Sequence, residues 1–277
     1  MLNGLWVLFI WLLHFAGTAQ SDSRPALSAG VLTSPIKLDG QLNEDDWENA
    51  PMADAFLTIE PVEKGVPSAE TRVRVLASER TVVIGIECRG QAHEDLVRFS
   101  KLRDADISEE DHIKVVLDPF MDGQSGFIFA VNAYGARYDA LVSNRGESEN
   151  EDWDAVWDAR IALIDNGWSV EIILPIQSIS YKKGSDTWGF NVERRIQRNL
   201  ETIRWANVQR DQFFGQTSRA GLLTTLPEFN FGLGLNVRPS LVGDLNKVGP
   251  DDSAAVSYTH LRAHETTSLI SYAVFCL

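Results

Sequence analysis

The chain has 277 residues, a hydrophobic fraction of 44% and a formal net charge of −14 at pH 7. A chain this acidic repels the phosphates of nucleic acids and of anionic lipids, so neither is an expected partner. Its two cysteines and five histidines form neither a disulfide framework nor a zinc-ligand spacing, and no Ser-His-Asp arrangement or Gly-rich phosphate loop is present.

The first 19 residues are predicted to be a signal peptide. The apolar run 5–15 is short for a stable membrane anchor, and the small residues 17–19 offer a cleavage site before Gln20. No Lys or Arg precedes the run, which leaves an N-terminal membrane anchor as the alternative. Export is the favoured interpretation.

Residues 36–50 are predicted to form a short strand, a tight turn and an acidic helical turn. Asp39-Gly40 supplies the positive φ that a tight turn needs, and Asn43 is placed to cap the helical turn. Trp47 and Ala50 lie three residues apart and share one face. This segment is therefore expected to pack on the core through its tryptophan.

The middle of the chain is predicted to form short strands. Period-two alternation of apolar residues, interrupted by Gly, Asp and Asn turns, occurs in the rows 72–77, 82–88, 113–118, 127–132, 168–174 and 188–196. Such rows are typical of antiparallel sheets that bury one face. We therefore expect an all-β, antiparallel β-sandwich of immunoglobulin-like or jelly-roll type, with little helix.

Residues 229–255 are interpreted as the start of a truncated outer-membrane β-barrel. Apolar residues from Phe229 to Val237 alternate with small or polar residues from Asn230 to Arg238, the pattern of a barrel strand. The alternative is a final sandwich strand.

Residues 256–277 are interpreted as a non-native tail. The stretch 255–266 resembles a translated sequencing-adaptor sequence and has no clear periodicity. A genuine irregular tail is the alternative. Either interpretation removes Cys276 from any functional argument.

Several segments in order resemble the carbohydrate-binding module family 9 type of β-sandwich. The resemblance spans residues 34–226 within a predicted domain at 24–228, and its motifs are 36–50, 111–119, 127–135, 167–175 and 188–195. Two further stretches, 152–157 and 195–205, resemble a subgroup that precedes an outer-membrane barrel of unknown function.

The resemblance implies carbohydrate binding by a non-catalytic, exported module. Such modules accompany enzymes that hydrolyse O-glycosyl bonds, which implies a role in carbohydrate catabolism by association. The expected partners are a poly- or oligosaccharide and the outer membrane, reached through the missing barrel, and the expected location is the periplasm or outer membrane of a Gram-negative-type bacterium. The alternative is a structural or gating domain of an outer-membrane barrel protein without sugar affinity.

A saccharide site needs a flat aromatic face and polar groups for hydroxyls. Trp153 and Trp157 lie in an acidic stretch at 147–158 and are the candidate stacking platforms, although Trp157 would belong to the core if it shares the register of its alanine neighbours. The candidate polar contacts are Asn132, Asn191, Glu193 and Arg194. Arg194 interrupts an apolar row, so it is either a buried partner or a ligand contact.

Two further carboxylate predictions follow from the pattern. Glu171 sits within a strand and is expected to pair with an arginine such as Arg72 or Arg195. The acidic run 104–111 could hold structural calcium through Asp104, Asp106 and Asp111. It lacks a calcium-loop consensus, and a solvated charged turn is the alternative.

Overall fold

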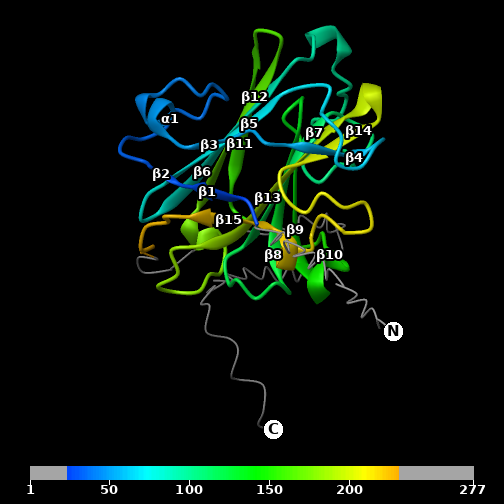
Figure 1. The fold of residues 1–277 in the computed structure, drawn as a ribbon. Helices are drawn as coiled ribbons and strands as arrows, with labels where there is room; N and C mark the ends of the chain where they lie inside the picture. Colours follow the sequence, from blue (N-terminus) through cyan, green and yellow to red (C-terminus); the bar gives the residue numbers. More distant parts are fainter. Residues whose placement is uncertain (1–23, 231–277) are drawn as a thin grey trace, which may run out of the picture.

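The computed structural model describes residues 24–230. This span is nearly all β, and its strands form two sheets that pack face to face (Figure 1). The β-sandwich predicted from the sequence is therefore confirmed. The predicted signal peptide at 1–19, the tail at 256–277 and all but the first two residues of the predicted barrel start lie outside the described residues.

The larger sheet has nine strands in the order β1-β15-β13-β7-β8-β9-β10, and β14 and β4 extend it beside β13. Their bounds are β1 Ala26–Ser28, β4 Leu57–Glu60, β7 His112–Asp118, β8 Gly126–Asn132, β9 Arg137–Ser143, β10 Ser148–Asn150, β13 Trp188–Ile196, β14 Glu201–Arg204 and β15 Gly221–Thr224.

The smaller sheet has six strands in the order β11-β12-β6-β5-β2, with β3 also paired to β5. Their bounds are β2 Gly30–Val31, β3 Met52–Ala53, β5 Thr71–Ala77, β6 Thr81–Arg89, β11 Asp158–Ile164 and β12 Gly167–Pro175. The helical elements of the described span are α1 Asp45–Asn49 and the 3₁₀ turns η1 His93–Asp95, η2 Asn144–Gly146, η3 Ile176–Ser178, η4 Gln197–Asn199 and η5 Thr217–Arg219. Within residues 24–230, no helix combines the length and hydropathy needed to cross a membrane.

The strand register confirms the alternating rows and corrects one detail of the sheets. The central pairs, such as β7 with β13 and β6 with β12, are antiparallel as expected. However, β1 pairs with β15 and β2 pairs with β5 in parallel. Both parallel pairs involve the first two strands of the described chain. These strands lie at the edges of their sheets, next to strands that are otherwise paired antiparallel.

The core between the sheets takes one face of each strand. It contains Val73, Val75, Ile84, Ile86, Ile113, Val115, Phe129, Trp168, Val170, Trp188 and Phe190, all fully buried. Because side chains alternate along a strand, the neighbouring residues point to the two outer faces of the sandwich. What covers those outer faces differs between the sheets.

The segment 32–50 covers the outer face of the smaller sheet. Trp47, on α1, packs there with Leu76 and Val83, and α1 lies beside β2 and β5 (Figure 1). Gly85 on β6 makes the room, because a Cβ at that position would lie 2.9 Å from the Trp47 ring. The helix begins after Glu44 without a side-chain cap, so the cap predicted at Asn43 is wrong.

Glu171 ties this segment to the sheet. Its Oε2 accepts hydrogen bonds from the backbone N–H groups of Asp39 (3.0 Å) and Gly40 (2.8 Å), and its Oε1 accepts from Trp47 Nε1 at 3.3 Å. The arginine partner predicted for Glu171 is therefore wrong, because the carboxylate is satisfied by the turn. Gly40 has φ of +85° and leaves no space for a side chain, since a Cβ would lie 2.4 Å from the backbone of Ile161.

Two loops cover the outer face of the larger sheet. The loop before β7 places Ile107 over Ala130 and Ala136, and the loop before β15 places Phe214 over Val116 and Ile128. The end of the described chain also docks on the sandwich, because Phe229 stacks on Trp188 with ring centroids 5.1 Å apart. The packed domain thus reaches beyond the predicted boundary at residue 228.

Candidate functional site

The two tryptophans predicted as sugar platforms both pack on the core. Trp157 is 5% exposed and meets Phe129 edge-on at 5.1 Å between ring centroids, so the platform role is corrected to a core position. Trp153 is half-buried and packs on Phe127 at 5.0 Å. Only part of its ring is open to solvent.

Asn132 and Asn191, predicted to bind sugar hydroxyls, are buried and bond to the protein instead. Asn132 donates from Nδ2 to Ser100 O and Glu110 Oε2, both at 2.9 Å, and its Oδ1 accepts from two backbone N–H groups. Asn191 exchanges hydrogen bonds with the backbone of Ala206 at 2.9 Å in both directions. In this structure the two side chains hold loops over the larger sheet and are closed to a ligand.

Arg194 and Glu193 are likewise held inside the fold. Arg194 has no exposed surface and donates to Glu70 O at 2.8 Å, to Thr71 Oγ1 at 3.1 Å and to Gln91 Oε1 at 3.2 Å. Glu193 accepts from Arg204 Nε at 2.5 Å, and both side chains are 9% exposed. Arg194 is therefore a buried partner in this structure, one of the two roles that its position left open.

The three residues predicted to hold calcium do not converge. Asp111 is buried and accepts from Gln91 Nε2 at 2.8 Å and from the Val97 N–H at 2.6 Å. Asp106 accepts from the Ser108 N–H at 2.9 Å, within its own turn. Only Asp104 of the three belongs to a set of converging carboxylates, and its companions there come from other segments.

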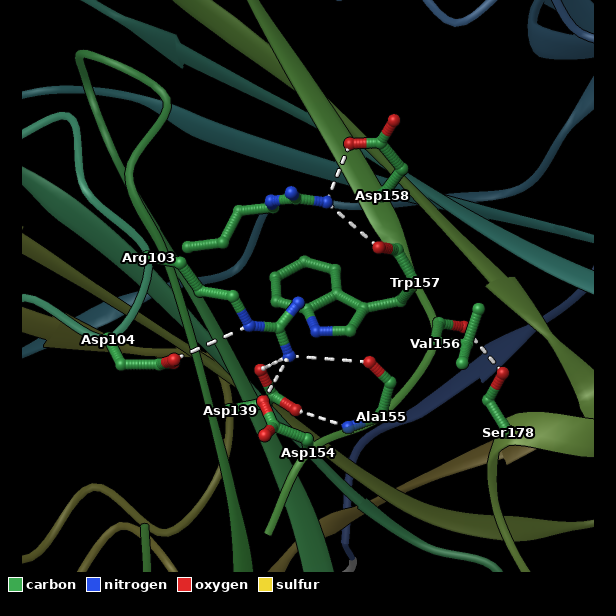
Figure 2. A network of polar contacts seen from close by, with 10 residues as sticks. Arg103, Asp104, Asp139, Asp154, Ala155, Val156, Trp157, Asp158 and Ser178 are labelled. Atoms are coloured by element: carbon green, nitrogen blue, oxygen red, sulfur yellow. Dashed lines mark hydrogen bonds and ion pairs between the residues drawn. The ribbon is translucent and has the colours of Figure 1, made fainter. Parts of the chain in front are cut away.

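That set is Asp104, Asp139 and Asp154, each with one carboxylate oxygen within 4.8 Å of the others. The guanidinium of Arg103 lies among them, at 3.4 Å from Asp104, 2.7 Å from Asp139 and 2.9 Å from Asp154 (Figure 2). We call these four residues the Arg103 clamp. The sequence analysis singled out neither Arg103 nor Asp139: Asp139 lies on β9, which was not among the predicted rows, and Arg103 lies just before the acidic run 104–111.

A pocket of about 380 Å³ opens beside the Arg103 clamp, on the outer face of the larger sheet. Its lining is formed by Asp104, Ala105, Asp106, Ile107, Ser108, Lys114, Tyr138, Glu149 and Glu151. Two walls therefore come from the two acidic segments that the sequence singled out, 104–111 and 147–158. Neither segment supplies the pocket alone.

The floor of the pocket follows from strand register. Lys114 on β7 pairs with Ala130 on β8, which pairs with Tyr138 on β9, so Lys114 and Tyr138 point to the same side with a small residue between them. Asp104 N donates to Arg137 O at 2.8 Å, whereas β10 pairs with β9 only from Leu141 onward. The pocket lies in the gap between these two contacts.

The electrostatics keep the Tyr138 hydroxyl protonated. Burial, with a further contribution from Glu149 and Glu151, raises the pKa of Tyr138 above its ordinary value, and its hydroxyl donates to Glu149 Oε2 at 3.4 Å. Lys114 brings a positive charge to the same floor. The pocket thus offers an aromatic ring, an ammonium and several carboxylates, which are groups that suit polyhydroxylated ligands.

A second hollow, of about 330 Å³, lies beside α1 and is lined by Thr33, Ser34, Pro35, Ile36, Glu44, Asp45 and Asp46. The carboxylate of Asp46 is already bonded to the Thr33 N–H at 2.8 Å and to the Ser34 N–H at 3.2 Å. No aromatic residue lines this hollow, so the pocket on the larger sheet is the candidate site.

Comparison of the fold with solved structures identifies sandwiches of the same architecture. A Bacteroides uniformis ATCC 8492 protein, whose assignment as carbohydrate-binding is itself provisional, matches with a TM-score of 0.58 and 11% identity, over 73% of this chain and 99% of that one. A carbohydrate-binding module family 9 domain from Caldicellulosiruptor kristjanssonii in complex with cellotriose matches with a TM-score of 0.51 and 14% identity. The match covers 78% of this chain and 100% of that one.

The same kind of domain from that organism in complex with glucose matches with a TM-score of 0.51 and 13% identity, over 75% of this chain and 98% of that one. No protein-family model matches the sequence, and no curated protein matches it. At these identities the likeness is one of fold, and the fold is that of the family 9 carbohydrate-binding sandwich.

Proposed function

We propose that this chain is a non-catalytic saccharide-binding module whose ligand occupies the pocket between residues 104–108 and 149–151. The observation that carries the proposal is this pocket, with Tyr138 and Lys114 on its floor, on a sandwich of the family 9 type. A volume near 380 Å³ is within the range of small-ligand sites. In this proposal the carboxylates, Lys114 and the Tyr138 hydroxyl of the lining form hydrogen bonds with the hydroxyl groups of the ligand.

The test is isothermal titration calorimetry of the full chain with glucose, cellotriose and a panel of plant and bacterial glycans. One stacked ring adds about 0.5–1.5 kcal/mol beyond its buried area, and each neutral hydrogen bond adds about 0.5–1.5 kcal/mol net. We therefore expect dissociation constants in the micromolar to millimolar range.

Two variants locate the site. Tyr138→Phe removes the hydroxyl and keeps the ring, and Lys114→Met removes the charge and keeps most of the stem. Each is expected to weaken binding by about threefold to tenfold. Tyr134→Phe, at a tyrosine 40% exposed outside the pocket lining, and Lys183→Met, at an exposed lysine before β13, are the matched controls and should bind as the wild type does.

Binding that survives both pocket variants would keep the function and reject the site. A second candidate function is a structural or gating domain without sugar affinity. The burial of Asn132, Asn191 and Arg194 favours it, because these side chains serve the fold. No heat with any glycan would select this alternative.

Export and membrane association are part of the proposal. They rest on the apolar run 5–15 and on the alternation after Phe229. Cell fractionation of the expressed full chain, with N-terminal sequencing of the product, tests them, and we expect cleavage after residue 19. The association with enzymes of polysaccharide breakdown rests on the resemblance to family 9 modules. Structural calcium is a separate proposal, which titration of the chain with calcium would test.

A further inference from the structure

We propose, on the basis of the saccharide-binding function above, that Arg103 is a positioning residue of the pocket. Its single guanidinium joins the two segments that form the pocket walls, which are the loop 104–108 and the segment 149–151 at the end of β10. One wall begins at Asp104, the neighbour of Arg103, and the other includes Glu151, three residues before Asp154.

The contacts of Arg103 reach three separate segments. Besides its ion pairs, Nη2 donates to Ala155 O at 3.3 Å, and the Ala155 N–H donates to Asp139 Oδ2 at 2.6 Å. Asp139 lies on β9, whereas Ala155 follows the second wall (Figure 2). The guanidinium therefore closes a ring of hydrogen bonds that runs from the first wall through the sheet to the second wall.

The mutual repulsion of the three carboxylates explains why a cation is required in this ring of hydrogen bonds. Three carboxylates whose oxygens lie within 4.8 Å of one another repel strongly unless a positive charge lies among them. Burial raises the pKa of the Asp139 carboxyl, and its hydrogen bond from the Ala155 N–H and the charge of Arg103 act in the opposite direction. Arg103 supplies from within the chain the charge that a bound cation would otherwise supply.

The neighbouring cations are engaged elsewhere. Arg137 contacts Asp158 at 2.7 Å, and Arg160 contacts the same carboxylate at 2.6 Å. Arg98 and Lys101 lie over the ring of Tyr134. Among residues 24–230, Arg103 alone forms an ion pair with Asp139 and with Asp154. Its loss should therefore loosen the 149–155 segment, because within the described part of the chain no other cation forms an ion pair with Asp139 or Asp154.

The experiment compares Arg103→Gln, Arg103→Lys and the control Arg160→Gln in the full chain. Arg160 is 54% exposed in its side chain and its ion pair is with Asp158, outside the Arg103 clamp. Two quantities are measured for each: cellotriose affinity by calorimetry, and hydrogen exchange of the backbone amides at 104–108 and 149–155. Near-UV circular dichroism verifies that each variant is folded.

For Arg103→Gln we expect about tenfold weaker binding together with about tenfold faster exchange in both walls. Arg103→Lys should restore part of both, because it keeps the charge but loses the bidentate geometry. Arg160→Gln should leave both unchanged. This joint pattern would support the positioning role.

Other outcomes separate the two proposals. Wild-type affinity and exchange in Arg103→Gln would overturn the positioning role and leave saccharide binding intact. Faster exchange with unchanged affinity would make Arg103 a purely structural residue and would also overturn the proposal. If the wild type binds no glycan, the proposed function fails and the positioning role fails with it, and faster exchange in Arg103→Gln would then identify Arg103 as a purely structural residue.

Discussion

Two polar clusters hold loops against the sandwich, and they do so with different partners. At Glu171 a fully buried carboxylate accepts from the backbone N–H groups of Asp39 and Gly40 and from the indole of Trp47. At the Arg103 clamp, carboxylates meet one side chain that is 32% exposed. Backbone donors cannot leave without unfolding the turn, whereas a guanidinium can rotate away. The first cluster is therefore suited to fixing the fold, and the second to holding a wall of a site.

The largest expected effect tests the rigid cluster. Trp47→Ala removes a ring that is 1% exposed and the donor to Glu171 Oε1, and should lower the free energy of unfolding by about 3–5 kcal/mol. Urea denaturation of the full chain measures it. Trp153→Ala, at a half-buried ring that packs on Phe127 of the larger sheet, is the matched control and should cost less. An equal or larger cost for Trp153→Ala would contradict the comparison.

A smaller effect is expected at the Arg103 clamp. Arg103→Gln loses hydrogen bonds to charged groups, but the partial exposure of Arg103 screens them. We expect the free energy of unfolding to fall by about 1–2 kcal/mol, measured by the same urea titration. Combining Arg103→Gln with Asp154→Asn should cost less than the sum of the two changes, because they remove the same ion pair. Strict additivity would show that this ion pair does not stabilise the fold.

The smallest effect is a difference in pH dependence. Burial raises the pKa of Glu171 above its ordinary value of 4.5, and the negative charge of Glu44 raises it further, whereas the hydrogen bonds from Gly40, Asp39 and Trp47 lower it. The folded state therefore binds this proton more tightly than the unfolded state. The stability that the group contributes is fully present below pH 4.5 and is lost as the pH rises through the folded pKa, with a slope of at most about 1.4 kcal/mol per pH unit.

Glu171→Gln should remove this part of the slope, which chemical denaturation of wild type and variant from about pH 2 to pH 7 would measure. Asp106→Asn is the control of opposite sign. The hydrogen bond from the Ser108 N–H lowers the pKa of Asp106, so its contribution is present above pH 3.8 and is lost as the pH falls. A wild-type slope identical to that of Glu171→Gln would contradict the assignment.

The strands were predictable because their burial leaves a period of two in the sequence. The rows at 113–118 and 188–196 became β7 and β13 with the expected core faces. The Asp39-Gly40 turn and the packing of Trp47 were also predictable, since they depend on local φ and on spacing along one helical turn. The exposed strand β10 was missed because all of its residues face solvent, so it carries no alternation of burial.

For the candidate site, the sequence indicated which two segments contribute and did not indicate which residues within them line the pocket. The acidic stretches 104–111 and 147–158 both contribute to the pocket, but the residues within them that were singled out have other roles. Alternation along a strand predicts that Asn132 and Asn191 point away from the core. The sequence of the strand does not indicate whether a distant loop covers that outer face. The loops before β7 and β15 cover it, and both amides became buried supports.

The sequence by itself thus determined the sandwich and the segment that opens it, because both depend on patterns within a few residues. Only the tertiary structure decided which polar residues meet. Arg103 reaches Asp139 and Asp154 across 36 and 51 residues of chain, and Glu171 meets Gly40 across 131. Such contacts depend on how two sheets stack and which loops return over them. That arrangement is set by the burial of the whole core, and no single stretch of sequence contains it.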